Sequence, residues 1–283
     1  DIKDADNVTL EWLEFDGTGA VTTRIHSFIT DHGNFTKNNT VRNCLMHGFE
    51  LISGGATVNM IRLTTSQSSL TSGESHYILN NIIYGNVMST IAGWSPTGIY
   101  ANSGRAENPI YVYNNTIHDL TAKTESNTAF GIKVSPYSVV TNNIVTDITG
   151  SSTSACFANV GVTSTASRDY NLSTDDTAFG SNSIQSAILN NIYSSASGTV
   201  DLHLKPGSPA VDAGFDLGRT PKNVNIDIDG RNRDAESDTW DIGADEFVLN
   251  GVVINPTAAV VEVSIPDPTV VTAIRITPNV AAM

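Results

Sequence analysis

The sequence predicts an all-β protein, folded as a right-handed parallel β-helix of about six to seven coils, with a β-rich fragment at its C-terminal end. Three observations predict this fold. Only 16% of the 283 residues are charged, 22 are glycine, and no amphipathic pattern of three helical turns is present. A doubled asparagine with apolar flanks recurs along the chain, and a second apolar strand recurs between its copies.

The doubled asparagine indicates a corner in each coil. Clear copies lie at 77–83, 111–117, 139–145 and 187–193, with weaker copies at 41–46 and 10–15. Apolar residues stand two before and three after the first asparagine, so in a straight strand they would point to opposite faces. The chain must therefore bend there, and asparagine tolerates the left-handed conformation that a bend needs. The expected structural ladder comprises the first residues of the pairs, Asn43, Asn80, Asn114, Asn142 and Asn190.

The spacing between these corners is irregular. Successive copies are separated by 31, 37, 34, 28 and 48 residues, counted from Trp12 to Asn190. Such variation is typical of a solenoid whose coils share strands but differ in their loops.

A second repeated strand lies between the corners. Its inward positions are expected to be Ile25, Ile61, Ile99, Ile132 and Phe157, and its outward positions His26, Arg62, Tyr100, Lys133 and Ala158. This register places Cys44 and Cys156 three coils apart, beyond the reach of a disulfide, since coils stack at about 4.8 Å. Both cysteines are therefore expected to be free, buried thiols.

Charge limits the classes of partner. Fifteen basic residues against 29 acidic ones give a net charge of −14, which repels nucleic acid and anionic membrane surfaces. No run of about 18 apolar residues predicts a membrane span, and no leader pattern is present. Because the chain begins at Asp1 and ends abruptly at Met283, we expect a piece of a longer protein.

Three closing motifs carry a family resemblance. They are Gly-Ser-Pro-Ala-Val-Asp-Ala-Gly at 207–214, Asp-Ile-Asp-Gly-Arg-Asn-Arg at 227–233 and Asp-Ile-Gly-Ala-Asp-Glu at 241–246. With the repeats, the chain resembles the pectate-lyase-like superfamily, and its ending is similar to the bacterial choice-of-anchor Q family. The resemblance implies an extracellular or cell-surface location and a variable module downstream. We predict a β-helix over 1–247 with a cap from about 205, and at 248–283 the start of a further β-module, stalk or linker.

The outward positions of the second strand are candidate catalytic residues. Lyases on the resembled fold remove a proton beside a uronate carboxylate, which needs a base and a cation for the acid group. Lys133 would be the base, Arg62 the charge clamp, and Tyr100 or His26 the proton donor. The alternative is an ordinary solvated face, because outward strand positions are generally polar.

Aromatic residues before the corners form a candidate binding patch. Tyr77, Tyr111 and Tyr113 would stand beside Arg42, and aromatic rings in a row suit the C–H faces of sugars. Cross-strand aromatic pairing, or cover by a long loop, explains the same residues without a ligand.

The other titratable residues are weaker candidates for a catalytic or metal site. Asp119 and Asp147 lie one coil apart, but turns explain them better than glycoside hydrolysis does. His47 and His118 are too far apart for one metal, and no metal or cofactor is required. The stretch Asn225–Glu236 has the acidic spacing of a calcium loop without flanking helices, so calcium is possible but unsupported. In the alternative, Asp227, Asp229 and Asp241 pair with Arg231 or Arg233 to close the stack.

Three functions follow. The first is glycan binding by an extracellular, cell-surface or virion-surface β-helix, with a polysaccharide as partner. The second is a polysaccharide lyase or glycoside hydrolase. The third is a structural spacer in an adhesin or filament, in which the chain assembles into oligomers.

Overall fold

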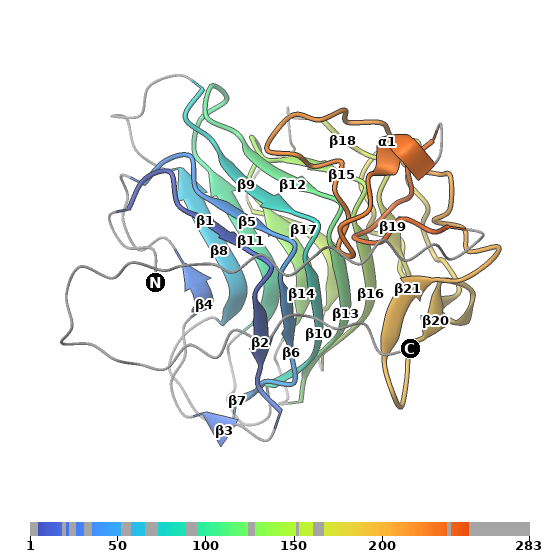
Figure 1. The fold of residues 1–283 in the computed structure, drawn as a ribbon. Coiled ribbons are helices and arrows are strands. Elements are labelled where there is room, and N and C mark those ends of the chain that lie inside the picture. The colour runs from blue at the N-terminus through green and yellow to red at the C-terminus, as the bar shows by residue number, and fades with distance from the viewer. Residues whose placement is uncertain are drawn as a thin grey trace, which may run out of the picture.

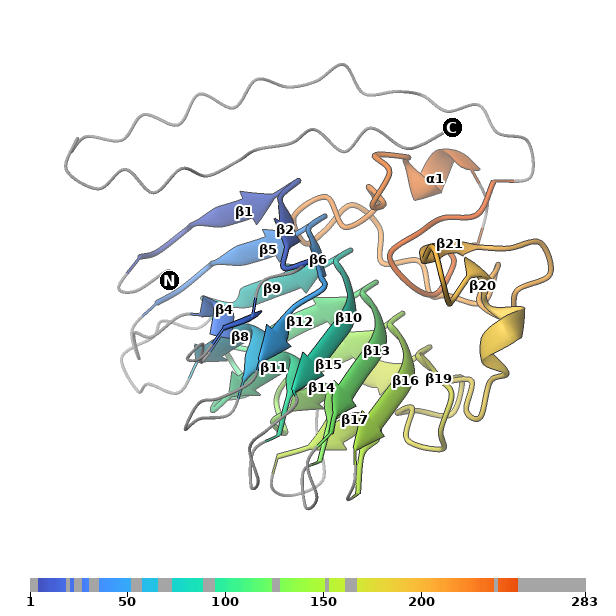
Figure 2. The same ribbon diagram turned by 90° about the horizontal axis from the view of Figure 1, so that it is seen from below.

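The protein is a parallel β-helix of six coils (Figures 1 and 2). The computed structural model describes residues 5–18, 21–22, 27–30, 36–51, 58–65, 73–88, 95–123, 128–150, 153–160, 167–236 and 239–248. Each coil contributes one strand to each of three sheets, here named A, B and C, until the last coil, which has strands only in A and B. The predicted fold class is therefore confirmed; residues 249–283 lie outside the described part.

All three sheets are parallel. Sheet A comprises β1 (Thr9–Glu11), β5 (Thr40–Arg42), β9 (His76–Leu79), β12 (Ile110–Tyr113), β15 (Val139–Thr141) and β18 (Arg168–Asp169). Sheet B comprises β2 (Glu14–Asp16), β6 (Leu45–His47), β10 (Ile82–Met88), β13 (Thr116–Ala122), β16 (Ile144–Gly150) and β19 (Leu172–Ser173), with β3 (Val21–Thr22) and β7 (Glu50–Leu51) beside them. Sheet C comprises β4 (Ser27–Thr30), β8 (Asn59–Thr65), β11 (Thr97–Ser103), β14 (Phe130–Val134) and β17 (Ala155–Asn159).

The corner between sheets A and B is formed as the asparagine pairs predict. Its first residue has a left-handed backbone in every coil, with φ between 50° and 58°, at Trp12, Asn43, Asn80, Asn114, Asn142 and Tyr170. The flanking apolar residues consequently turn into one interior, where Val41, Ile78 and Val112 stack in sheet A. Met46 and Ile83 stack likewise in sheet B.

The amide ladder runs through the second asparagine of each pair, not the first. The backbone N–H of Asn81 donates to Oδ1 of Asn115 (3.1 Å), and that of Asn115 donates to Oδ1 of Asn143 (3.0 Å). Asn143 donates in the same way to Asn171 at 3.0 Å. The first asparagine points outward because its left-handed backbone turns its side chain away from the interior, so the stacking that the sequence suggested belongs to its neighbour.

Sheet C has the predicted inward column except in its first coil. Ile61, Ile99, Ile132 and Phe157 pair in register and are buried. The residue paired with Ile61 in the first coil is Ile29, four residues beyond the expected Ile25. The loop before β4 is therefore longer than the repeat suggested.

The last corner lies at Tyr170 and Asn171, not at Asn190. β18 and β19 flank it and pair with β15 and β16. Asn190 lies in a 3-10 turn, η1 (Leu189–Asn191), and its neighbour Ile188 is 66% exposed. The apolar and asparagine pattern at 187–193 is thus a coincidence of composition.

Residues 174–184 close the C-terminal end of the stack. The side chains of Asp175 and Thr177 accept the backbone N–H groups of Cys156 (2.8 Å) and Phe157 (2.9 Å) in the last strand of sheet C. Phe179 packs edge-on against Phe157 at 5.5 Å between ring centroids. The hairpin of β20 (Tyr193–Ser195) and β21 (Asp201–Leu204) follows.

The segment after β21 lies along the side of the stack. We call residues 205–236 and 239–247 the clasp; it contains the short helix α1 (Arg233–Glu236) and is drawn in orange beside the parallel strands in Figures 1 and 2. Asn43 and Asn80 donate to the carbonyl of Ile226 at 3.1 and 2.8 Å, and Asn142 donates to the carbonyl of Phe215 at 2.8 Å. The outward first asparagines therefore hold the clasp across several coils.

Both cysteines are free and buried, as the register predicts. Burial raises the pKa of each thiol to about 12. No helix in the described part of the chain is long and apolar enough to cross a membrane.

Candidate functional site

The outer face of sheet C brings together three of the four predicted catalytic residues. Arg62, Tyr100 and Lys133 pair in register on β8, β11 and β14, so they stand on successive coils about 4.8 Å apart. All three are partly exposed. The guanidinium of Arg62 lies 5.8 Å from the centre of the Tyr100 ring, within cation–π range.

The fourth predicted residue, His26, lies outside the described residues. The position beside Arg62 on β4 is occupied by Thr30 instead. At the other end of the row, Ala158 pairs with Lys133. The row is therefore a cation, an aromatic ring and a cation, with small side chains at both ends.

No acidic residue occurs in the five strands of sheet C, although the chain has 29. Nε of Arg62 is buried and has no hydrogen-bond partner among the described residues. The ammonium of Lys133 lies 4.3 Å from the centre of the Phe130 ring. Burial lowers the pKa of Lys133 below its ordinary value. The face is thus positively charged on a protein whose net charge is −14.

The tyrosine patch of sheet A is assembled, but the clasp covers part of it. Tyr77 and Tyr111 stack at 5.4 Å with an interplanar angle of 7°, and Tyr113 tilts against Tyr111 at 5.5 Å. Tyr113 is only 7% exposed, because Val224 and Trp240 of the clasp pack with it. Its ring is therefore unable to stack on a sugar, whereas Tyr77 and Tyr111 are partly exposed.

Arg42, the fourth residue of that patch, also serves the clasp. Its Nε donates to Glu11 at 2.6 Å, and its guanidinium donates to the carbonyl of Lys222. The ammonium of Lys222 in turn lies 5.6 Å from the centre of the Tyr77 ring. These contacts correspond to cover by a long loop, the alternative that the sequence left open.

Structural roles account for the other residues that the sequence singled out. Asp119 and Asp147 have left-handed backbones, with φ of 51° and 54°, in a second bend within sheet B. Asx residues tolerate this conformation, which accounts for both without catalysis. His118 is buried, and its ring nitrogens bond Thr146 and the carbonyl of Ala196.

The acidic stretch from Asn225 bonds within itself. Asp227 accepts the backbone N–H groups of Asp229 (2.9 Å) and Arg231 (2.7 Å), and Asn225 donates to Asn232 (2.8 Å). Asn225 and Asp227 therefore hold a turn. The suggested pairing of Asp229 with Arg231 is present at 3.2 Å.

Sequence reasoning missed one cluster of titratable groups, at His203, Asp229 and Asp245. The pKa of His203 is raised to about 10, chiefly by its hydrogen bond to Asp229. A shared sequence signal was absent, because the three residues come from separate segments of the chain.

The fold defines a parallel β-helix protein, and the described outer face of sheet C carries the cations Arg62 and Lys133. No family model, no curated protein and no solved structure matches the chain.

Proposed function

We propose that this protein is an extracellular or surface-associated β-helix that binds an anionic glycan on the outer face of sheet C. The observation that carries the proposal is the row of Arg62, Tyr100 and Lys133, two cations on either side of an aromatic ring in a sheet whose described strands contain no acidic residue. The two cations stand about 10 Å apart, two coils along the axis. Carboxylates or sulfates of one polymer chain can contact both while a sugar ring lies on Tyr100.

The three closing motifs support the proposed extracellular location of the protein. Asp227, Asp241 and Glu246 are buried and accept backbone N–H groups of the clasp, so the motif residues have a structural purpose in this fold. Their similarity to the choice-of-anchor Q ending therefore supports membership of that family and of the pectate-lyase-like superfamily. An extracellular place, outside the cell or on its surface, is part of the same proposal.

Glycan affinity electrophoresis tests the binding proposal. A polyuronate in the gel should retard the wild-type chain, its methyl ester should retard it less, and added salt should weaken the retardation. The double variant Arg62→Gln, Lys133→Gln should bind at least tenfold more weakly, since each lost contact is worth about 1 kcal/mol. The variant Lys123→Gln, Arg219→Gln removes the same charge from residues outside sheet C and should bind normally. Equal loss in both variants would show that only net charge matters.

The lowered pKa of Lys133 supports a second function, elimination from a uronate. A base must be neutral at working pH, and burial moves lysine in that direction. Ultraviolet absorbance of an unsaturated product, lost in Lys133→Met, would establish a lyase. Binding without product supports glycan binding. If neither binding nor product is found, a structural spacer is the remaining function.

A further inference from the structure

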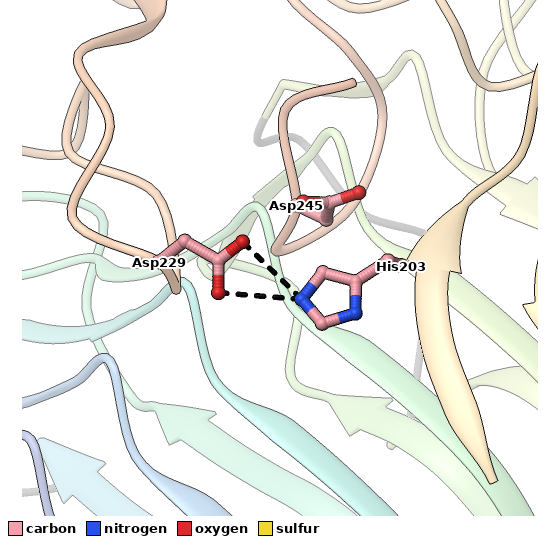
Figure 3. Close-up of side chains that lie close together, drawn as sticks. All are labelled: His203, Asp229 and Asp245. Carbon is pink, nitrogen blue, oxygen red and sulfur yellow. Dashed lines mark hydrogen bonds and ion pairs between the residues drawn. The ribbon is translucent and has the colours of Figure 1, made fainter. Parts of the chain in front are cut away.

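We propose that His203, Asp229 and Asp245 bind one divalent transition-metal ion of the Zn²⁺ class, where the β20–β21 hairpin meets the clasp. Figure 3 shows the imidazole of His203 facing the carboxylate of Asp229, with Asp245 beside them. One imidazole nitrogen and carboxylate oxygens are a donor set that zinc and its neighbours accept. The site lies apart from sheet C and is independent of the proposed glycan.

The distances are close to those of a metal site. Nε2 of His203 lies 3.2 Å from Oδ1 and from Oδ2 of Asp229. One ligand atom from each of the three residues lies within 4.8 Å of the other two. Ligands about 2.0–2.2 Å from a tetrahedral metal lie about 3.3–3.6 Å apart, so His203 and Asp229 already stand near this spacing, and the pairs that lie up to 4.8 Å apart must close by about 1 Å.

Each ligand is held by contacts outside the ligand set. Asp201 bonds Nδ1 of His203 at 2.5 Å, which leaves Nε2 to face the site, as carboxylates do behind metal-bound histidines. Asp227 fixes the turn that carries Asp229. Oδ2 of Asp245 accepts the backbone N–H of Leu204 at 2.7 Å. The donors are therefore positioned before any ion arrives.

Asp245 is the residue that most favours a cation here. Its side chain is 4% exposed, and the one contact of Oδ1 within the described residues is the guanidinium of Arg231 at 3.5 Å, the outer limit of a hydrogen bond. A buried carboxylate oxygen with so weak a partner is costly. His203, 44% exposed, leaves a path from solvent to this oxygen.

The charge balance favours a dication. A metal ion at Nε2 of His203 takes the place of the imidazole proton; the carboxylates of Asp201, Asp229 and Asp245 then face the ion and the guanidinium of Arg231, and two positive charges on the ion complete the balance. The guanidinium of Arg231 donates to the carbonyl of Glu246 at 3.2 Å. It also pairs with Asp229 and Asp245, the two carboxylates that would bind the ion. It therefore weakens metal binding without blocking it, and removing its charge should tighten binding.

Cobalt is the probe for the test. The full-length chain, freed of metal with a chelator, should bind about one Co²⁺ with a visible ligand-field band, and Zn²⁺ should displace it. His203→Gln should abolish the band, and Asp201→Asn should weaken affinity about 10- to 100-fold. Arg231→Gln should bind more tightly, which a purely structural ion-pair network does not predict.

A matched control separates this site from surface histidines. His47 also lies near two acids, Glu14 at 3.0 Å and Asp16 at 3.7 Å, so His47→Gln should leave the band unchanged. If His203→Gln does not fold by circular dichroism, Asp229→Asn takes its place. No band in the wild type, or an equal band in the His203 and Asp229 variants, would overturn the proposal. Neither result bears on glycan binding.

Discussion

The two residues of each corner do different things. The first supplies a backbone conformation, and the second supplies an amide that joins neighbouring coils. Asn114 and Asn115 show the division clearly, because both are fully buried. The amide of Asn114 has no partner among the described residues, whereas that of Asn115 bonds Asn81, Asn143 and two carbonyls.

Removing the ladder amide should be costly. Asn115→Ala leaves the N–H of Asn81 and two carbonyls without their buried partner, and each such group costs about 1–3 kcal/mol. We expect a loss of roughly 3–5 kcal/mol in the free energy of unfolding, measured by denaturant titration. Asn114→Gly is the matched control, because glycine adopts positive φ freely; it should change stability by less than about 1 kcal/mol. Similar losses in both variants would refute the division of roles.

His76 makes stability depend on pH. It is fully buried, and its Nδ1 accepts the backbone N–H of Asn39 at 3.1 Å. Burial lowers its pKa from 6.5 to about 4, so the folded protein binds fewer protons than the unfolded chain between these values. The contribution of His76 is complete above pH 6.5 and disappears as the pH falls towards 4, a change of about 3 kcal/mol.

The variant His76→Asn isolates this effect. Asparagine can accept the same N–H but does not titrate. Unfolding free energies at about pH 7.5 and about pH 4.5 should therefore differ more in the wild type than in the variant, by roughly 3 kcal/mol. An equal pH dependence in both proteins would show that His76 is not the group responsible, since other buried acids also titrate in this range.

At the scale of elements, the clasp depends on a buried ion pair. Arg233 and Glu246 are both fully buried, 2.7 Å apart. Arg233 also donates to the carbonyl of Gly243 at 2.9 Å and to Asn80 at 3.3 Å, so it joins the clasp to the corner of the third coil. Losing one partner of such a pair is worse than losing both.

Arg233→Met should release the clasp while the coils remain folded. We expect a loss of about 3–5 kcal/mol, because Glu246 is left buried without its cation. Hydrogen exchange should rise in residues 205–236 and 239–247 and stay slow in sheet C. The double variant Arg233→Met, Glu246→Gln should recover much of the loss. Uniform exchange throughout the chain would mean that clasp and coils unfold together.

The repeat was predictable because it is local. The apolar positions two before and three after each corner need only the period of a strand and the tolerance of asparagine for positive φ, and five of the six corners follow from them. Tyr170 was missed because a tyrosine is rare in the left-handed region, so Asn190 took its place in the prediction. The ladder position had a signal: a second asparagine directly after the corner residue, at Asn81, Asn115 and Asn143.

The clasp was not predictable in the same way. Asn43 and Ile226 are 183 residues apart in the chain, and no repeat connects them. Contacts of this kind place the clasp over part of the tyrosine patch. The roles of Arg62, Tyr100 and Lys133 remain predictions, although their shared register is now established.

For the whole molecule, the two thiols report on integrity. Cys44 and Cys156 lie in the second and fifth coils, and both are buried. A pKa of about 12 in place of 9.0 leaves roughly a thousandfold less thiolate at neutral pH. Labelling by a disulfide reagent should therefore proceed only as fast as the chain unfolds, and rise with denaturant along the unfolding transition. Rapid labelling of native protein would show that the coils open locally.

The three sheets also give the molecule unequal sides. Where the clasp packs against the coils, the protein's own chain occupies the surface, so a ligand cannot bind there. On sheet C, the row of Arg62, Tyr100 and Lys133 advances by one coil with each residue. Adding or deleting a coil would therefore lengthen or shorten this row by one residue without changing the side chains at the other positions.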